Sequence, residues 1–477
     1  MIQATSSGAG KTLLCSCLCK IAREMGINVA PFKAQNMSNN VVITADGGEV
    51  SSAQWLQAKG CGIIVSSNMN PVLVKPKPNN KSEIIVCGKL ECNNYVYPGS
   101  VEFRNYIRER IITSFRRLSA RHELIIIEGA GASSEVNLRE YDTSNMWIAS
   151  LLNCDVVLVS DIERGGMLAS LVGTHRLLRP SESRLIKGYV VNKFSGELSI
   201  LKPGLRIVSS ITDWPCYGVI PWKSEAFKLP SEDSIWERHN VIRSAYVGII
   251  IDLPFFCNYN DYAALCTEPN ISVLYAKTPP VCVWSNIKFI IVPDVASVSA
   301  GLKHLLSLGW ADYIREAHRQ KVLIIGVGAG LLMLSDKFTL NNNVFFGFGI
   351  LRASVSILSV PASWVTCYCK LLNLSISVGA SKTICYNSTS VSERVLPLLA
   401  NNYAEYGIYS CGIWGVCVQG LFLNDIFRHT FLKALGLQTY FSVYSVKVDK
   451  ILSELAYSIA QNLSAEFISL IRDGSLC

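Results

Sequence analysis

The stretch "ATSSGAGKT" (residues 4–12) carries the pattern that decides how the first half of this chain folds. Gly8 and Gly10 permit a tight loop whose backbone amides point toward phosphate oxygens. Lys11 adds a mobile positive charge, and the Thr12 hydroxyl is of the kind that binds magnesium in phosphate loops. The run that follows reads as a helix. We therefore predict a strand, loop and helix that bind ATP through Ser7, Gly8, Ala9, Gly10, Lys11 and Thr12.

The strict form of this loop, GxxxxGK[ST], is not met, because its first glycine falls at Thr5. Three further residues nevertheless fit a phosphate site. Glu128, just past an apolar run, is expected to be a second magnesium ligand, and Asp46 in "TADGGE" is another candidate metal ligand. Lys33 also follows an apolar run and is expected to reach a transferred phosphoryl group. The alternatives are helix-capping carboxylates and an ordinary surface lysine.

The overall composition limits the classes of protein to which this chain can belong. The chain has 477 residues, of which 50% are hydrophobic and 17% charged, so we expect two or three folded domains. We find neither an apolar run of roughly 18 residues, as a membrane span needs, nor a signal peptide, and we expect a cytoplasmic protein without a membrane partner. The net charge of +8 contains no Lys/Arg block that would indicate nucleic-acid binding. The 17 cysteines form no paired CxxC motifs, so free thiols are expected rather than zinc.

Strand-like and helix-like segments alternate along the chain, which predicts the α/β class. We predict a parallel-sheet P-loop domain over residues 1–235, a linker over 236–244 and a second α/β domain over 245–430. Residues 431–477 have helical spacing and are expected to form a C-terminal extension. In parallel sheets, ligands bind at the carboxyl ends of the strands, where polar turns such as that of "LIIIEGAG" (124–131) lie.

Several segments together resemble one family, the cobyric acid synthases. They match it in order and spacing: "PFKAQNMSNN" (31–40), "TADGGEVSSAQ" (44–54), "NMNPVLVKP" (68–76), "IIIEGAGASSEVNLREYDTSNM" (125–146), "VSDIERGGMLASLVGT" (159–174) and "VVNKFSG" (190–196). The resemblance spans essentially the whole chain. It implies a step of cobalamin biosynthesis, in which ATP and ammonia amidate the b, d, e and g carboxylates of adenosylcobyrinic a,c-diamide to give adenosylcobyric acid, through an acyl phosphate.

The resemblance also implies roles for individual residues. Lys11 and Lys33 are expected to neutralise charge on the transferring phosphoryl group, with Mg²⁺ bridging the phosphates. Asn192 matches the position that reads the adenine edge. Ala4 stands where the family has glycine, and its methyl group is expected to crowd the phosphate loop. The residues expected to face the corrin, with loop packing as the alternative, are Asn70, Lys75, Asn137, Arg139 and Asn145.

The second half resembles the class I glutamine amidotransferase domain, in which a Cys nucleophile and a His base release ammonia from glutamine. In "IGVGAGLLML" (325–334), Gly328 stands at the nucleophile position. In "CVQGLF" (417–422), Gln419 stands at the base position, and the turn expected near the oxyanion reads "PDVAS". A glycine has no side chain that could attack a carbonyl carbon. The resemblance therefore implies an amidotransferase-like domain that has lost its catalytic residues.

A dinucleotide-binding turn is a rival interpretation of the same glycines. It requires an acidic residue about 20 positions later, but no Asp or Glu occurs between Lys337 and Ser392. Three hypotheses remain for the whole chain: a synthetase that uses free ammonia or ammonia from another source, a non-catalytic paralogue that binds nucleotide or corrinoid, and another P-loop enzyme of the dethiobiotin synthetase or ParA-like type. Whether glutamine is used at all is left open.

Overall fold

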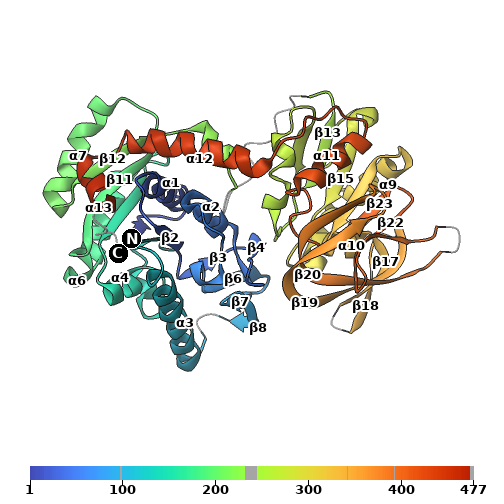
Figure 1. Ribbon diagram of the computed structural model, residues 1–477, viewed down its shortest axis with the longest axis horizontal. Helices are drawn as coiled ribbons and strands as arrows, with labels where there is room; N and C mark the ends of the chain where they lie inside the picture. Colours follow the sequence, from blue (N-terminus) through green and yellow to red (C-terminus); the bar gives the residue numbers. More distant parts are fainter. Residues whose placement is uncertain (97–98, 231–243, 341, 391–392, 473–477) are drawn as a thin grey trace.

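The computed structural model shows two α/β units side by side (Figure 1). It describes residues 1–96, 99–230, 244–340, 342–390 and 393–472. Apart from Ser244, the linker predicted over 236–244 lies outside these residues. Both units are of the α/β class, as the alternating pattern of the sequence predicted, and their order agrees with the P-loop domain and amidotransferase-like domain that the family resemblance implied.

The first unit is built on a parallel sheet, as predicted. In spatial order its strands are β2 (Val29–Phe32), β9 (Leu124–Ile127), β1 (Ile2–Ala4), β10 (Val156–Asp161), β11 (Ile186–Phe194) and β12 (Cys216–Pro221). A single bridge between Ile2 and Glu128 attaches β9 to β1. Most of these strand residues are buried, because helices cover both faces of a parallel sheet. The carboxyl ends of β1, β2 and β9 therefore meet at one edge.

Helices of the first unit follow its strands in the order that the sequence pattern suggested. They are α1 (Lys11–Glu24), α2 (Ser52–Cys61), α3 (Val101–Ser119), α4 (Met146–Leu152), α5 (Met167–Leu177), α6 (Pro180–Ser183) and α7 (Leu198–Thr212). A small sheet of β3 (Gln35–Met37), β6 (Val72–Lys77), β7 (Lys81–Val86) and β8 (Lys89–Val96) and a hairpin of β4 (Val41–Ile43) and β5 (Glu49–Ser51) stand beside the main sheet. Nowhere in the described ranges is a helix long and apolar enough to cross a membrane.

The second unit has one large sheet that is parallel in one part and antiparallel in the other. The parallel strands are β14 (Ser272–Ala276), β13 (Val247–Ile251), β15 (Ile287–Val292), β16 (Leu323–Val327) and β23 (Ile413–Val416). The sheet continues through β22 (Glu405–Ser410), β21 (Leu396–Ala400), β19 (Leu351–Cys369), β17 (Ser335–Leu340) and β18 (Asn343–Phe346), with β20 (Leu374–Ser388) paired to β19. The sequence did not predict the long antiparallel hairpin β19–β20.

The α-helices that accompany this sheet in the described residues are α8 (Val298–Ser307), α9 (Trp310–Arg319), α10 (Ala329–Leu334) and α11 (Asp425–Ala434). Because α11 continues past residue 430, the boundary predicted there falls inside a helix. Arg428 of α11 is 2% exposed and forms an ion pair with Glu268 (Nε to Oε1, 2.9 Å). This buried pair ties α11 to the second unit.

The C-terminal helices return to the first unit (Figure 1). Helix α12 (Tyr444–Ala460) shares an apolar core with α1, in which Val448 and Leu452 are buried together with Leu14 and Leu18. In α13 (Ala465–Arg472), the ring of Phe467 stacks on Tyr217 with the centroids 5.4 Å apart. The predicted helical extension is therefore part of the core of the P-loop domain.

Polar contacts join the two units near the hairpin β4–β5. The backbone N–H of Val41 donates to Asn258 Oδ1 (3.0 Å), and that of Tyr259 donates to Asn40 Oδ1 (2.9 Å). Asn260 Nδ2 donates to Ser52 Oγ (2.8 Å) at the start of α2. The segment that follows β13 is thereby held against the first unit.

Candidate functional site

The phosphate loop joins β1 to α1 with backbone angles that require glycine. Gly8 (φ +70°) and Gly10 (φ +96°) adopt the left-handed region, which glycine enters without steric cost. A Cβ on Gly10 would lie 2.2 Å from Nδ2 of Asn192, so a side chain there would have to displace the Asn192 amide. Helix α1 begins at the next residue, Lys11. Its N-terminal amides therefore lie at the loop, in the arrangement that binds anions at helix N-termini.

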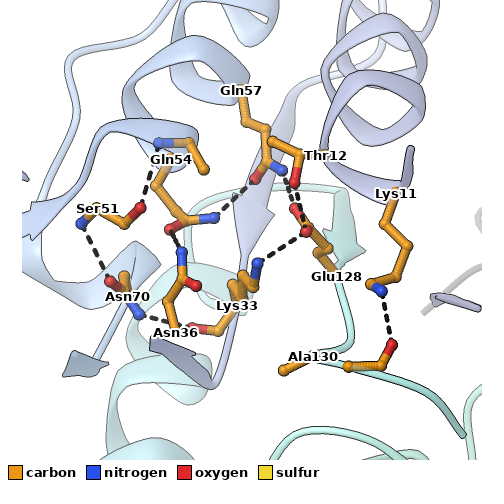
Figure 2. Close-up of polar contacts among 12 residues, drawn as sticks. Lys11, Thr12, Lys33, Asn36, Ser51, Gln54, Gln57, Asn70, Glu128 and Ala130 are labelled. Atoms are coloured by element: carbon orange, nitrogen blue, oxygen red, sulfur yellow. Dashed lines mark hydrogen bonds and ion pairs between the residues drawn. The ribbon is translucent and has the colours of Figure 1, made fainter. Parts of the chain in front are cut away.

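Lys11 and Thr12, the first two residues of α1, extend toward the end of β9 (Figure 2). Lys11 Nζ donates to the carbonyl oxygen of Gly131 (2.7 Å). Thr12 Oγ1 donates to Glu128 Oε1 (2.7 Å). The structure thus brings together the lysine, the hydroxyl and the carboxylate that the sequence assigned to one phosphate site.

Lys33 and Glu128 form a buried ion pair at the ends of two neighbouring strands. Strands β2 and β9 run parallel, so the residues that follow them leave the sheet at the same edge. Lys33 Nζ lies 2.8 Å from Glu128 Oε1, and the two side chains are 4% and 0% exposed. A charge this deeply buried needs a partner of opposite sign. Lys33 is therefore not the surface lysine of the alternative interpretation.

Thr12 and Glu128 fit the magnesium ion that the P-loop implies. They present a hydroxyl and a carboxylate oxygen 2.7 Å apart at the wall of the cavity, and Mg²⁺ prefers oxygen ligands, usually one or two from protein with the rest from phosphate and water. Within the described ranges, no cluster of three or more His, Cys, Asp or Glu side chains is placed to hold a metal. A site with only two protein ligands is consistent with that result.

The structure does not bring Asp46 to this site, contrary to its predicted role as a metal ligand. Asp46 lies in the turn between β4 and β5, where its Oδ2 accepts hydrogen bonds from Ser67 Oγ (2.6 Å) and from the Ser67 backbone N–H (3.4 Å). It is not among the described residues that line the cavity. The hairpin directs this carboxylate toward the start of a neighbouring 3-10 turn instead.

Asn192 and Ala4 lie on strands of the sheet close to the phosphate loop. Asn192 Nδ2 donates to the carbonyl oxygen of Ala9 (2.8 Å), so in the structure the amide supports the loop. Ala4 is 1% exposed and belongs to the same apolar core as Val159. Its carbonyl oxygen accepts from the backbone N–H of Ser133 (2.9 Å). The Ala4 methyl group therefore packs in the core under the loop.

A cavity of about 1600 Å³ opens at this edge of the sheet. Its volume exceeds the roughly 300–1,000 Å³ that one small ligand occupies, so it has room for more than one. The phosphate loop contributes Ser7, Gly8 and Gly10, the second unit contributes residues such as Tyr259 and Asn260, and α12 contributes Lys447, Lys450 and others. Both units and the C-terminal helix therefore enclose the space next to Lys11.

Of the residues expected to face the corrin, two line the cavity. Arg139 holds Glu182 with two hydrogen bonds (Nε to Oε1, 3.0 Å; Nη2 to Oε2, 2.9 Å). The Asn145 side chain forms two hydrogen bonds with the backbone of Ala130: Nδ2 donates to the carbonyl oxygen (2.5 Å) and Oδ1 accepts from the N–H (3.2 Å). Both side chains are thereby fixed at the cavity wall.

The other three, Asn70, Lys75 and Asn137, are not among the described cavity-lining residues. Asn70 is 1% exposed, and its amide donates to the carbonyl oxygen of Lys33 (3.2 Å). Lys75 pairs with Glu49, and Asn137 is exposed on a short 3-10 helix. Asn70 and Lys75 match the loop-packing alternative that the sequence left open, whereas the exposed Asn137 matches neither interpretation.

In the second unit, the turn after β16 has the sharp geometry of a nucleophile elbow but no nucleophile. Gly328, with φ +53° and ψ −116°, lies between β16 and α10. A Cβ at this position would lie 2.3 Å from the carboxyl carbon of Asp294. Asp294 Oδ1 accepts from the backbone N–H of Ala329 (2.7 Å), and Oδ2 forms an ion pair with Lys382 Nζ (3.1 Å). A carboxylate thus occupies the place of the expected thiol.

Gln419, at the expected base position, lies at the boundary between the two units. Its backbone pairs with Gly379, and its buried Oε1 has no hydrogen-bond partner within the described part of the chain. Although burial raises the pKa of Glu49, the charges of Lys75 and Lys382 and a hydrogen bond from Gln419 bring that pKa below its ordinary value. An amide that holds a carboxylate cannot serve as a base.

Cys417 is one nucleophile candidate near this turn. Its thiol donates to the carbonyl oxygen of Lys382 (3.3 Å), and burial raises its pKa to about 12. The thiol is therefore protonated near neutral pH, whereas catalysis requires a thiolate. The described histidines of the second unit, His304, His318 and His429, all lie on helices.

Two features of the site were not predicted from the sequence. They are the ion pair between Asp294 and Lys382 and the contact of Gln57 with Glu128. The two members of the ion pair are 88 positions apart, so nothing local signals that they meet. Gln57 donates to Glu128 Oε2 from α2. A weak signal for it existed, because Gln54 and Gln57 are separated by three positions and so lie on one face of a predicted helix. An amide pair in an otherwise apolar helix face indicates a buried polar partner.

Comparison with known proteins agrees with this geometry. Residues 1–235 match the CobQ/CobB/MinD/ParA nucleotide-binding domain, and residues 249–363 match the CobB/CobQ-like glutamine amidotransferase domain. Cobyric acid synthases from Brucella abortus (33% identity), Sinorhizobium fredii (32%) and Allorhizobium ampelinum (32%) align with 98% of this chain, each over 98% of its own length.

The fold and the site thus define an ATP-dependent ligase made of a P-loop synthetase domain and an amidotransferase-like domain. The full-length matches then specify the family: the chain belongs to the cobyric acid synthase family, whose members act in cobalamin biosynthesis. The third hypothesis, another P-loop enzyme of the dethiobiotin synthetase or ParA-like type, is thereby excluded.

Proposed function

We propose that this chain uses ATP and free ammonia to amidate the b, d, e and g carboxylates of adenosylcobyrinic a,c-diamide, giving adenosylcobyric acid. One contrast supports this proposal. The phosphate-handling residues Lys11, Thr12, Lys33 and Glu128 are assembled at a large cavity, whereas the elbow at Gly328 contains the Asp294 carboxylate in place of a thiol. ATP chemistry is retained, and glutamine hydrolysis is lost.

The reaction has two steps. A carboxylate oxygen of the corrinoid attacks the γ-phosphorus of ATP, the bond to the β,γ-bridging oxygen breaks, and ADP leaves. The nitrogen lone pair of ammonia then attacks the acyl carbon of the resulting acyl phosphate. Inorganic phosphate leaves with the electrons of the C–O bond, and nitrogen gives up a proton to water. Each amide formed consumes one ATP and one ammonia.

The chain contributes mainly positioning and charge. The amides of the phosphate loop and the first turn of α1 bind the phosphate oxygens, and Lys11 neutralises charge on the group being transferred. Lys33 acts on the same charge from its place beside Glu128 at the cavity wall. Magnesium, when held by Thr12 and Glu128, supplies further neutralisation of the phosphate oxygens.

The corrinoid and the adenine occupy opposite parts of the cavity in this proposal. Arg139 and Asn145 face the corrin, since both line the cavity and both side chains are fixed by their partners. Asn192 reads the adenine edge, next to the phosphate loop that it supports. The second unit serves as a wall through Tyr259 and Asn260, and ammonia enters from solvent.

A paired amidation assay tests this function. The purified chain is given the a,c-diamide and MgATP, with either ammonium or glutamine, and the products are separated by mass. Amides form with ammonium and not with glutamine. Lys11→Met abolishes the reaction because it removes the charge that meets the phosphoryl group. His429→Ala, a change on α11 outside the described cavity lining, leaves the ammonium-dependent rate unchanged.

Two outcomes would overturn the proposal. Glutamine-dependent activity that a thiol-directed reagent abolishes would show a working glutaminase. Absence of ATP turnover with either nitrogen source, in a chain that still binds nucleotide or corrinoid, would identify the non-catalytic paralogue of the second hypothesis.

A further inference from the structure

The two carboxylate oxygens of Glu128 face different sets of partners (Figure 2). Oε1 accepts from Thr12 Oγ1 (2.7 Å) and from Lys33 Nζ (2.8 Å), on the side of the phosphate loop. Oε2 accepts from Nε2 of Gln57 on α2. Gln57 therefore helps to set the orientation of the carboxylate. In these hydrogen bonds, the Gln57 amide contacts neither the phosphate loop nor Lys33.

Gln57 is the last member of a chain of three buried amides. Asn36 Nδ2 donates to Gln54 Oε1 (3.3 Å), and Gln54 Nε2 donates to Gln57 Oε1 (3.4 Å). Gln54 and Gln57 are 0% exposed, and Asn36 is 2% exposed. Asn36 belongs to β3 and lines the cavity. The chain thus runs from the cavity wall to the far oxygen of Glu128.

The direction of this chain follows from the charge at its end. An ionised carboxylate can only accept hydrogen bonds, so Gln57 must present its NH₂ group to Glu128. The Gln57 carbonyl oxygen must then accept a hydrogen bond from the NH₂ group of Gln54. The Gln54 carbonyl oxygen accepts in turn from the NH₂ group of Asn36. In such a chain each bond polarises the next one. One arrangement of the three amides is therefore selected.

Helix α2, which carries Gln54 and Gln57, is connected by hydrogen bonds to the backbone of Lys33, directly after β2. Its N-cap residue Ser51 donates its backbone N–H to Asn70 Oδ1 (3.2 Å), and Asn70 Nδ2 donates to the carbonyl oxygen of Lys33 (3.2 Å). The amide chain and the Lys33–Glu128 pair thus share one support. Little movement of Gln57 relative to Glu128 is left.

We propose that Gln57 is a positioning residue, which holds Glu128 so that Oε1 faces Thr12 for metal binding, and that Gln54 and Asn36 fix Gln57 in turn. This role rests on the proposed function of Thr12 and Glu128 as the magnesium ligands. A residue that orients a metal ligand typically changes metal affinity 10- to 100-fold when it is removed. The effect should weaken with each step along the chain away from Glu128.

The test measures Mn²⁺ binding in the presence of ADP by electron paramagnetic resonance, a readout that does not depend on turnover. Gln57→Met removes both the donor and the acceptor and raises the Mn²⁺ dissociation constant about tenfold or more. Gln54→Met leaves Gln57 in place and raises it less. The Mg²⁺ concentration for half-maximal amidation rises in the same order.

Gln3→Met is the matched control. Gln3 is also a buried glutamine, on β1, but its amide donates only to the sulfur atoms of Met1 and Met146, and its Oε1 has no partner within the described residues. This variant leaves Mn²⁺ affinity unchanged. Equal affinities in the Gln57→Met and Gln3→Met variants would overturn the proposal.

Gln54→Met covers the case in which Gln57→Met fails to fold. It leaves Glu128, Lys33 and the hydrogen bond from Gln57 in place and removes only the donor that fixes the Gln57 carbonyl oxygen. It still raises the Mn²⁺ dissociation constant above that of Gln3→Met; equal affinities in these two variants would refute the role. If the Mn²⁺ series behaves as expected but no variant and no wild-type chain forms amide, the proposed function fails and the positioning role stands.

Discussion

Asp294 and Gly328 are fitted to each other: the carboxyl carbon of Asp294 lies 2.3 Å from the point where any Cβ at position 328 would be. The carboxylate accepts from Ala329, the first residue of α10, and pairs with Lys382. The family resemblance places the oxyanion turn near residue 294 and a cysteine at 328. The Asp294 carboxylate and a thiol at position 328 therefore exclude each other sterically.

Restoring the cysteine alone is expected to fail. Gly328→Cys introduces a side chain at φ +53° and into the Asp294 carboxylate, which lowers the free energy of unfolding by about 2–4 kcal/mol. No glutamate is released from glutamine, because Gln419 is still no base. Urea unfolding and a glutamate-release assay measure the two effects.

The same change in an Asp294→Gly background is the control. With the carboxylate removed, the added cost of Gly328→Cys falls by at least about 1 kcal/mol, since residues in contact give non-additive energies. Costs that simply add would show that the two positions are independent.

The buried Lys33–Glu128 pair should be sensitive to removal of one partner. Lys33→Met leaves a carboxylate at 0% exposure without its cation, which costs about 3 kcal/mol or more of unfolding free energy. Adding Glu128→Gln recovers part of that loss but not the ATP-dependent activity. Denaturant unfolding and the amidation assay report the two quantities.

Lys77 provides the comparison for this pair. It contacts Glu83 (2.6 Å) in the same unit, with side chains 24% and 27% exposed. Lys77→Met should cost no more than about 1 kcal/mol. If Lys33→Met costs as little, the buried pair does not have the electrostatic role that its environment indicates.

Gly10 and Gly26 offer a matched test of the phosphate loop. Both have positive φ, +96° and +83°, but a Cβ on Gly10 meets Asn192 at 2.2 Å, whereas one on Gly26 meets nothing within 4 Å. Gly10→Ala should weaken ADP binding at least about tenfold, equivalent to about 1.4 kcal/mol. Gly26→Ala costs only about 1–2 kcal/mol of stability. Calorimetric titration with ADP separates the two, and equal affinities would contradict the prediction.

Asp261 predicts a pH dependence of stability. Burial raises its pKa to about 7, although the Gly420 N–H, which donates to Oδ2 at 2.7 Å, opposes the shift. The folded chain then binds more protons than the unfolded chain between about pH 4 and pH 7, so stability falls as the pH rises through this window. The total loss is on the order of 2–4 kcal/mol.

Asp261→Asn should remove that dependence. The amide oxygen of asparagine still accepts from Gly420 but has no charge to desolvate. The variant matches the wild type below about pH 4 and is more stable than it at pH 8, as measured by urea unfolding at each pH. Parallel stability curves for the two proteins would rule the explanation out.

Much of the first half was predictable because its signals are local. The loop from Ser7 to Thr12 and the strand ends before Lys33 and Glu128 are each readable from a few neighbouring residues, and a parallel sheet necessarily brings its strand ends to one edge. Asp46 shows the limit: it has the right chemistry and follows a strand, but that strand belongs to a separate hairpin. Whether such a residue reaches the site depends on which strands pair with one another, and no local sequence pattern specifies strand pairing.

The second half shows the same limit in another form. Gly328 and Gln419 could be identified as missing catalytic residues from the sequence, because an absent thiol or imidazole is visible at its position. What replaced them was not visible. Lys382 reaches Asp294 only because the hairpin β19–β20 folds back over the turn, and the amide chain from Asn36 to Glu128 joins three segments that are distant in sequence.

The return of the C-terminal helices has a consequence for synthesis of the chain. Helix α1 packs part of its apolar surface against α12, so the core around residues 11–24 is complete only once residues 444–460 are present. At about 5–20 residues per second, this interval is on the order of a minute. During translation, the core of the P-loop domain therefore stays incomplete while the second domain is synthesised. A chain that ends early in α12 lacks the apolar contacts that this helix makes with α1, the helix that follows the phosphate loop.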